Sequence, residues 1–308
     1  MYQLAGHTMG TPEYTVFEAI DLFASIGLDG VEIVVQDGYV SGIPLDSSVE
    51  DLKAIKDHAQ RRGIDIICLT PYFSDYNCTD DTKRMAAVDG LRKVIGFANL
   101  LGARYIRIYG GTETLTDLET ATSEERQEKE RLLVESLKML GQESSQLGIT
   151  LVIENHFNTM AVSAADTARI VRSVDHPGVG ALYDQANLAF TAKEEYEQAI
   201  ALQAGIIKYV HVKDLVFKSD NWEFKSSDVT HQKEDERSVS TRIVGEGILP
   251  WPDIFTALIQ SGYRGWLSLE YERRWHPQDI PDARIGMKKS ADYVRKCLKK
   301  LKDSGLEG

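Results

Sequence analysis

The feature that most constrains the fold is an alternation of short apolar runs and longer amphipathic runs along the whole chain. The apolar runs have the length of buried strands, and the segments between them carry apolar residues at the spacing of one helix face. Strands are predicted at residues 2–5, 30–35, 65–69, 104–109, 150–153, 179–183, 207–212 and 265–269. Helices are predicted at residues 11–26, 49–62, 82–101, 124–147, 164–174, 194–204, 251–261 and 282–301.

Eight strand–helix units favour a closed parallel (β/α)₈ barrel, the TIM barrel, as one domain over residues 1–308. An open, doubly wound sheet is the alternative fold. Glycine often stands between a helix and the next strand, where a left-handed backbone can end the helix. These glycines are Gly27, Gly63, Gly102, Gly148, Gly205 and Gly262. The connection at residues 213–248 is too long for a bare loop and is predicted to be lid-like.

The composition excludes several classes of protein. A hydrophobic fraction of 43% and a charged fraction of 27% are typical of a soluble globular protein. A net charge of −12 argues against a protein built to neutralise nucleic-acid phosphates. The three scattered cysteines form no CxxC motif and suit a reducing compartment. Since no signal peptide or membrane-length apolar run is apparent, we expect a cytoplasmic protein without a membrane partner.

Each of the last four strands delivers one potential metal ligand at its carboxyl end, the end where barrels of this kind form their active sites. The ligands are, in chain order, Glu154, Asp184, His211 and Glu270. A carboxylate at one strand end is commonly a solvated cap or a salt-bridge partner. Carboxylates from neighbouring strands would repel one another unless a cation lay among them. The oxygen and nitrogen donors suit Mn²⁺, Co²⁺, Mg²⁺ or Zn²⁺, of which we expect Mn²⁺.

Several motifs resemble those of the xylose-isomerase-like barrel superfamily of sugar isomerases and epimerases. The matching segments are Ile153–His156, Tyr183–Leu188, Val210–Asp214, Gly245–Trp251 and Leu267–Glu272. The resemblance implies that Glu154, Asp184, His211 and Glu270 hold one divalent metal ion, and that Glu154 and Glu270 act as the catalytic acid and base. Many members carry histidine where this chain has Asn187, so the sequence departs from the family pattern there.

The resemblance implies a metal-dependent sugar, or sugar phosphate, isomerase or epimerase with a small carbohydrate as its substrate. The metal would stabilise the enediolate that forms when a carbon next to the carbonyl loses its proton. Return of the proton from the opposite face gives epimerisation, and return to the neighbouring carbon gives isomerisation. Candidate substrate-binding residues are His156, Asn187, Lys213, Arg242 and Arg273. The competing explanations are a structural hydrogen bond for His156, a salt bridge to Asp214 or another rim acid for Lys213, a solvated side chain for Arg242 and an inter-subunit contact for Arg273. His7 is expected to be a satisfied buried histidine.

Three other functions compete with this one. A dehydratase acting on a keto-polyol, such as an inosose or a dehydroshikimate-like substrate, would share the first proton abstraction. Lys213 or His156 would then protonate the departing hydroxyl. Abasic-site cleavage, as in endonuclease IV, needs a three-metal cluster and many histidines. Asn187 stands where that branch carries histidine, and the third and fourth strands end in Thr70 and Tyr109, neither of them a typical ligand. A non-catalytic binding protein would have little reason to keep clustered rim carboxylates. The resemblance also implies a homo-oligomer, dimeric or tetrameric.

Overall fold

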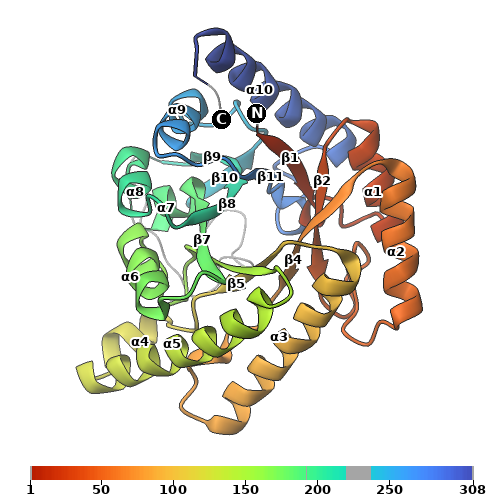
Figure 1. Cartoon of the computed structure of the whole chain (residues 1–308). Coiled ribbons are helices and arrows are strands. Elements are labelled where there is room, and N and C mark those ends of the chain that lie inside the picture. Colours follow the sequence, from red (N-terminus) through yellow and green to blue (C-terminus); the bar gives the residue numbers. More distant parts are fainter. Residues whose placement is uncertain (1, 192, 220–236, 307–308) are drawn as a thin grey trace.

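The strands of this computed structural model, which describes residues 2–191, 193–219 and 237–306, form a closed parallel barrel (Figure 1). The order around the sheet is β1-β11-β8-β7-β6-β5-β4-β2, and pairing of β1 with β2 closes the ring. This pairing excludes the open sheet and confirms the predicted barrel. The barrel strands are β1 (Gln3–His7), β2 (Gly30–Val35), β4 (Asp65–Pro71), β5 (Tyr105–Tyr109), β6 (Thr150–Glu154), β7 (Val179–Asp184), β8 (Ile207–Val212) and β11 (Trp266–Leu269).

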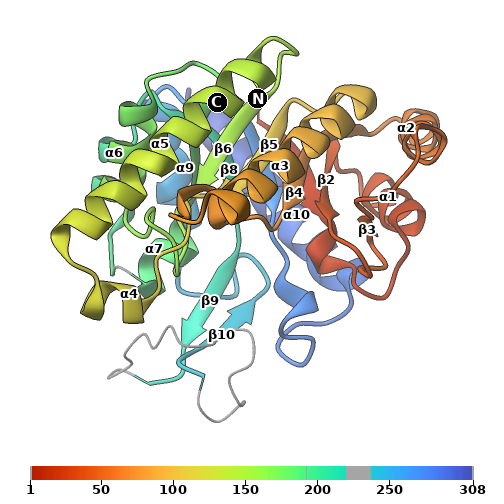
Figure 2. The same cartoon turned by 90° about the horizontal axis from the view of Figure 1, so that it is seen from below.

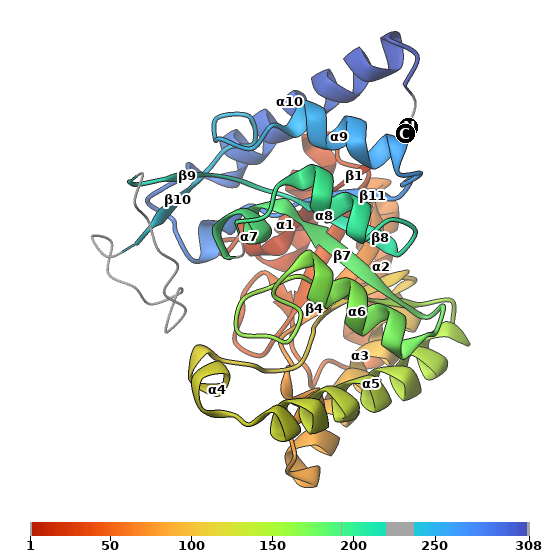
Figure 3. The same cartoon turned by 90° about the vertical axis from the view of Figure 1, so that its left-hand side faces the viewer.

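Helices surround the barrel on its outer side, as Figures 1 and 3 show. They include α1 (Val16–Ser25), α2 (Val49–Arg62), α3 (Asp81–Leu101), α5 (Ser123–Ser145), α6 (Ala164–Val174), α8 (Tyr196–Leu202), α9 (Trp251–Gln260) and α10 (Ala283–Asp303). The predicted bounds of α2 and α6 are confirmed. The predicted start of α1 at Thr11 is wrong, because the Thr15 side chain accepts the Glu18 N–H in a capping box and begins the helix there. Within the described ranges, no helix has both the length and the apolar character needed to cross a membrane.

The six glycines predicted to lie between helices and strands follow the ends of their helices, and two of them are the C-cap itself. All six have a left-handed backbone, with φ between 67° and 87°. Gly63 is the C-cap of α2 and Gly102 is the C-cap of α3. A side chain at these φ values would be strained, so glycine lets each helix end and the chain turn into the next strand.

Shorter elements were not predicted. They are β3 (Gly42–Ile43), α4 (Leu115–Thr120), α7 (Gln185–Thr191), the antiparallel pair β9 (Asp214–Phe217) and β10 (Val239–Arg242), and three 3₁₀ turns, η1 (Thr8–Gly10), η2 (Asp75–Asn77) and η4 (Glu272–Arg274). The pair β9–β10 extends from the barrel in Figure 2 and forms the base of the connection predicted to be lid-like. Residues 220–236 of that connection lie outside the described residues, so the lid remains a prediction.

Two layers of side chains fill the inside of the barrel. The lower layer is apolar and aromatic and comprises Ala5, Ile67, Cys68, Val152, Leu182, Tyr209 and Trp266. Side chains two residues apart on a strand lie on the same face. Two residues after Val152, Leu182 and Tyr209 come the predicted ligands of β6, β7 and β8. The alternation that buries the lower layer therefore directs the ligands into the barrel mouth, above an apolar floor.

The loop beside the barrel mouth is held by the buried carboxylate of Asp214. It accepts backbone N–H groups from Leu215 at 3.0 Å, Gly245 at 2.9 Å, Gly247 at 3.2 Å and Leu249 at 3.2 Å. A Cβ atom on Gly247 would lie 2.0 Å from Asp214 Oδ1, so only glycine permits this approach. Asp214 thereby joins β9 to the turn that follows β10.

Replacing Asp214 with alanine is expected to lower the free energy of unfolding by about 2–3 kcal/mol, because buried N–H donors lose a charged acceptor. Urea unfolding followed by circular dichroism measures the change. Asp292→Ala, which removes an exposed ion pair with Lys288, is the matched control and should cost under about 1 kcal/mol. Equal losses in the two variants would contradict this role of Asp214.

Candidate metal centre

The four predicted ligands converge at the mouth of the barrel. One ligand atom from each of Glu154, Asp184, His211 and Glu270 lies within 4.8 Å of the others. Glu154, Asp184 and His211 come from β6, β7 and β8, and Glu270 follows β11 directly. All four side chains are buried, Glu270 being the most exposed at 4%. The order β11-β8-β7-β6 in the sheet makes these strands consecutive neighbours, as the sequence analysis required.

His211 lies between the carboxylates. Its Nδ1 atom is 3.3 Å from Glu154 Oε1, 3.4 Å from Glu270 Oε1 and 3.8 Å from Asp184 Oδ2. Three carboxylates and one imidazole converging in this way provide hard oxygen and nitrogen donors, which fit a divalent cation. Asp184 Oδ2 and Glu270 Oε2 are buried and accept no hydrogen bond, although the Lys213 ammonium lies 3.1 Å and 2.7 Å from them as an ion-pair partner.

Arg107, which the sequence analysis did not select, is the counter-charge of Glu154. It lies on β5, is 2% exposed, and donates from Nε to Glu154 Oε2 at 2.6 Å, while its Nη2 atom contacts the same oxygen. Burial, the largest influence, would raise the pKa of Glu154, but the guanidinium of Arg107 together with His211 and His156 lowers the pKa below its usual value. The sequence feature that could have identified Arg107 is an arginine inside an apolar strand, two residues after Tyr105.

Lys213 is the second buried cation of the site. Its Nζ atom lies 2.7 Å from Glu270 Oε2, 3.1 Å from Asp184 Oδ2 and 3.0 Å from Glu272 Oε1. Burial would lower the pKa of Lys213, but the surrounding carboxylates raise it well above its usual value, so the amine stays charged. For Asp184, burial raises the pKa, and the positive charge of Lys213 opposes that rise. Glu272 was not selected from the sequence.

Asn187 and His156 also lie at the centre. Asn187, in the first turn of α7, donates its backbone N–H to Asp184 Oδ1 at 2.9 Å and its side-chain Nδ2 to Glu154 Oε1 at 3.3 Å. The His156 ring donates from Nδ1 to the carbonyl of Phe157 at 2.8 Å and packs edge-on against Tyr109. Burial lowers the pKa of His156 to about 4, so the ring is neutral near pH 7.

A cavity of about 420 Å³ lies above the ligands. His156, Asn187, Lys213 and Glu270 line it. Its aromatic lining consists of Tyr72, Tyr109, Phe157, Phe190 and Trp275. Apolar walls with a few polar groups at one end are typical of small-molecule sites.

Two predicted substrate-binding residues are not among those that line this cavity. Arg242 donates from Nη1 to the carbonyl of Thr241 at 2.8 Å. Arg273 donates from Nε to Glu13 Oε1 at 2.9 Å and from Nη1 to the carbonyl of Ile280 at 2.9 Å. The structure thus brings His156, Asn187 and Lys213 to the cavity and engages Arg242 and Arg273 in contacts elsewhere.

The sequence model of the xylose isomerase-like TIM barrel family matches residues 20–297, so the chain belongs to that family. Inosose dehydratase of Geobacillus thermodenitrificans is 25% identical over 231 residues, which cover 72% of this chain and 74% of that protein. A D-tagatose 3-epimerase-like protein superposes with a TM-score of 0.75 at 17% identity over 98% of this chain and 99% of that one. The 3-keto-D-glucoside 4-epimerase of E. coli superposes with a TM-score of 0.73 at 16% identity over 96% of this chain and all of that one. These structural likenesses show the fold, and the matched proteins include epimerases and a dehydratase.

Arg107→Met is expected to lower the free energy of unfolding by about 3–5 kcal/mol in metal-free protein, because Glu154 loses the counter-charge of a buried ion pair. Denaturant unfolding in the presence of a chelator measures the loss. Arg92→Met, which breaks a half-exposed ion pair with Glu143, is the control and should cost about 1 kcal/mol or less. A loss no larger than that of the control would mean that Glu154 does not depend on Arg107.

Proposed function

We propose that the protein is a divalent-metal-dependent isomerase or epimerase that removes a proton next to the carbonyl of an uncharged keto sugar. The observation that carries this proposal is the convergence of Glu154, Asp184, His211 and Glu270 on one buried point, which meets the cavity at Glu270. These four side chains would hold one ion, for which we propose Mn²⁺, with Co²⁺, Mg²⁺ and Zn²⁺ as alternatives. When bound, the ion would act as a Lewis acid that stabilises the developing oxyanion.

Glu154 and Glu270 are the proposed acid–base pair. Each is ionised at neutral pH, because Arg107 lowers the pKa of Glu154 and Lys213 lowers that of Glu270, in both cases against the effect of burial. An ionised carboxylate beside the substrate can take up the proton from the carbon next to the carbonyl. The other glutamate, which is also ionised, can return a proton once it has taken one up from solvent, and the first glutamate then gives its own proton to solvent; the product is the epimer or the isomer.

His156 and Asn187 are proposed to bind substrate hydroxyls. The neutral His156 ring uses Nδ1 on the Phe157 carbonyl, which leaves Nε2 as a hydrogen-bond acceptor for a hydroxyl group. The Asn187 amide already donates to Glu154 and lies on the cavity wall. The Asn187 amide can therefore contact both the Glu154 carboxylate and a bound substrate.

The charges around the cavity support an uncharged substrate. Among the described residues of the lining, Arg107 is paired with Glu154, and Lys213 is paired with three carboxylates. A phosphate group would need basic side chains that are free to pair with it. We therefore favour a sugar or keto-polyol without a phosphate.

The decisive experiment combines metal analysis with solvent-deuterium exchange. The purified protein is expected to hold one divalent ion per chain and to incorporate deuterium next to the carbonyl of its substrate, tested across a panel of unphosphorylated ketoses and cyclic keto-polyols. Glu154→Gln and Glu270→Gln should each lower the exchange rate at least 100-fold, because general acid–base catalysis contributes about 10²–10⁴-fold.

Glu113→Gln is the control, since Glu113 is also buried but pairs with Arg126 and belongs to neither metal-binding group. This variant should exchange at the wild-type rate. A protein without metal, or one whose exchange survives both glutamine substitutions at the ligands, would refute the proposal.

Dehydration is the second candidate function, and the position of Lys213 favours it. Its charged amine lines the cavity 2.7 Å from Glu270, where it could protonate a hydroxyl that leaves after the same first proton abstraction. The similarity to an inosose dehydratase supports this alternative.

Lys213→Met separates the two functions. If the enzyme is a dehydratase, mass spectrometry of products from keto-polyols should show loss of water with wild type and none with Lys213→Met, while deuterium exchange into the substrate continues. If wild-type protein converts substrates only to products of equal mass, dehydration is excluded.

A further inference from the structure

Three buried side chains lie beside His211 and have no role in the proposed chemistry. They are His7 on β1, Glu32 on β2 and Thr70 on β4, each at most 1% exposed. His7 and Thr70 follow inward residues of the lower layer, Ala5 and Cys68, by two positions, so they belong to the same polar layer as the ligands.

Glu32 is a fully buried carboxylate whose ion-pair partners in the described chain are two histidines. It accepts the Thr70 hydroxyl at 2.5 Å, and His211 Nε2 lies 3.2 Å from both of its oxygens. His7 Nε2 lies 3.4 Å from Oε1. Because a buried carboxylate is costly without donors, Glu32 depends on the hydrogen bonds from Thr70 and His211, whereas His7 Nε2 makes an ion-pair contact without a hydrogen bond.

The hydrogen bond at Nδ1 of His7 determines which ring nitrogen carries the proton. Nδ1 accepts the backbone N–H of Met9 at 3.0 Å, so Nδ1 carries a lone pair and no proton. The proton of a neutral His7 ring is therefore on Nε2, the atom beside Glu32. A protonated Nε2 has no lone pair and does not coordinate a metal ion.

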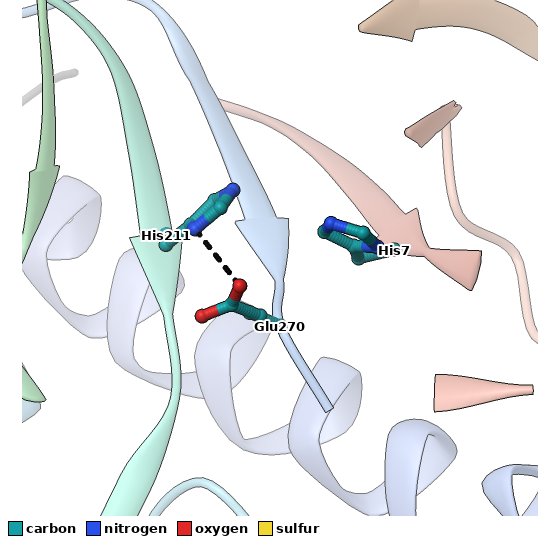
Figure 4. A group of neighbouring side chains, drawn as sticks. All are labelled: His7, His211 and Glu270. Atoms are coloured by element: carbon teal, nitrogen blue, oxygen red, sulfur yellow. Dashed lines mark ion pairs between the residues drawn. The ribbon is translucent and has the colours of Figure 1, made fainter. Parts of the chain in front are cut away.

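This matters because His7, His211 and Glu270 lie close enough together to form a second metal-binding group, as Figure 4 shows. The hydrogen bond from Met9 removes His7 from that group. Without His7, only His211 and Glu270 remain, and both already belong to the four-residue centre.

The same reasoning orients His211. An ionised Glu32 only accepts hydrogen bonds, so His211 Nε2 carries a proton that it donates to Glu32. The opposite ring nitrogen, Nδ1, faces the carboxylates of Glu154, Asp184 and Glu270. A carboxylate that receives the second N–H of a ligating histidine typically sets its tautomer and ring orientation.

We propose that Glu32, supported by His7 and Thr70, is a positioning residue that holds His211 with its proton on Nε2 and its metal-binding lone pair on Nδ1. In this arrangement His7 Nε2 carries a proton beside Glu32 and is not a ligand, and the centre holds one metal ion, not two. The inference rests on the proposed metal dependence and adds to it the residues that orient His211 for metal binding.

The test measures metal binding and histidine protonation directly, without an activity assay. Calorimetric titration with Mn²⁺ should give one site per chain for the wild-type protein. In Zn²⁺-loaded protein with ¹⁵N-labelled histidine, nuclear magnetic resonance should show His211 protonated on Nε2 and metal-bound through Nδ1. Glu32→Gln is expected to weaken Mn²⁺ binding about 10–100-fold and to shift or remove the Nε2–H signal.

Three further variants make the result specific. Thr70→Val removes one hydrogen bond to Glu32 and should change binding and signal in the same direction by a smaller factor, which keeps the test valid if Glu32→Gln folds poorly. His7→Gln should still bind one ion per chain. Glu113→Gln, the control with a buried glutamate elsewhere, should match the wild type in both measurements.

The inference is overturned if Glu32→Gln and Thr70→Val bind Mn²⁺ as tightly as the wild type and leave the His211 signal unchanged. It is equally overturned if the wild type binds two ions and His7→Gln binds one, since His7 would then be a ligand. A wild-type protein that binds no divalent ion would refute the proposed function together with this inference, and so differs from a failure of the inference alone.

Discussion

The structure depends on the placement of several carboxylates in one small buried volume at the mouth of the barrel. Glu32, Glu154, Asp184 and Glu270 are all at most 4% exposed, so water screens their repulsion poorly. Arg107, Lys213 and His211 provide the compensating charge and hydrogen bonds. Each of these three touches a different combination of carboxylates. Even with His211 protonated, three positive groups face four carboxylates, so removing any one of the three leaves a carboxylate unpaired.

The strand geometry that builds the barrel also builds the centre. Residues two apart on a strand share a face, so an apolar layer containing Val152, Leu182 and Tyr209 is followed by a polar layer containing the ligands. The apolar layer forms the floor of the site and excludes water from below. Because the barrel is closed, the polar layer draws side chains from strands that are distant in sequence, such as β1 and β8. Fold stability and ligand geometry thus rest on the same alternation.

The sequence predicted the parts of the site that stand at strand ends, and it missed those inside strands. Glu154, Asp184 and Glu270 were found because each breaks an apolar run. Arg107 and Glu32 lie within strands, and only closure of the barrel decides which face of a strand points inward. Arg273 was selected because it follows Glu270 closely, yet it pairs with Glu13, which lies 260 residues away in the chain. Helix α7 was missed because it begins at Gln185 directly after β7 ends, so no turn residue in the sequence separates it from the strand.

The two glutamates proposed as acid and base differ in what supports them. Glu154 is paired with a guanidinium, which holds its protons at any pH that the fold survives. Glu270 is paired with the ammonium of Lys213, which can release a proton to a substrate and be recharged from solvent. Protons can therefore be supplied through Lys213 on the Glu270 side, while on the Glu154 side the carboxylate itself must carry them. Under the proposed function, this difference between the two glutamates lets one arrangement of ligands serve two reactions. Epimerisation needs both glutamates. Loss of water needs the Glu270 side to deliver a proton to the leaving hydroxyl.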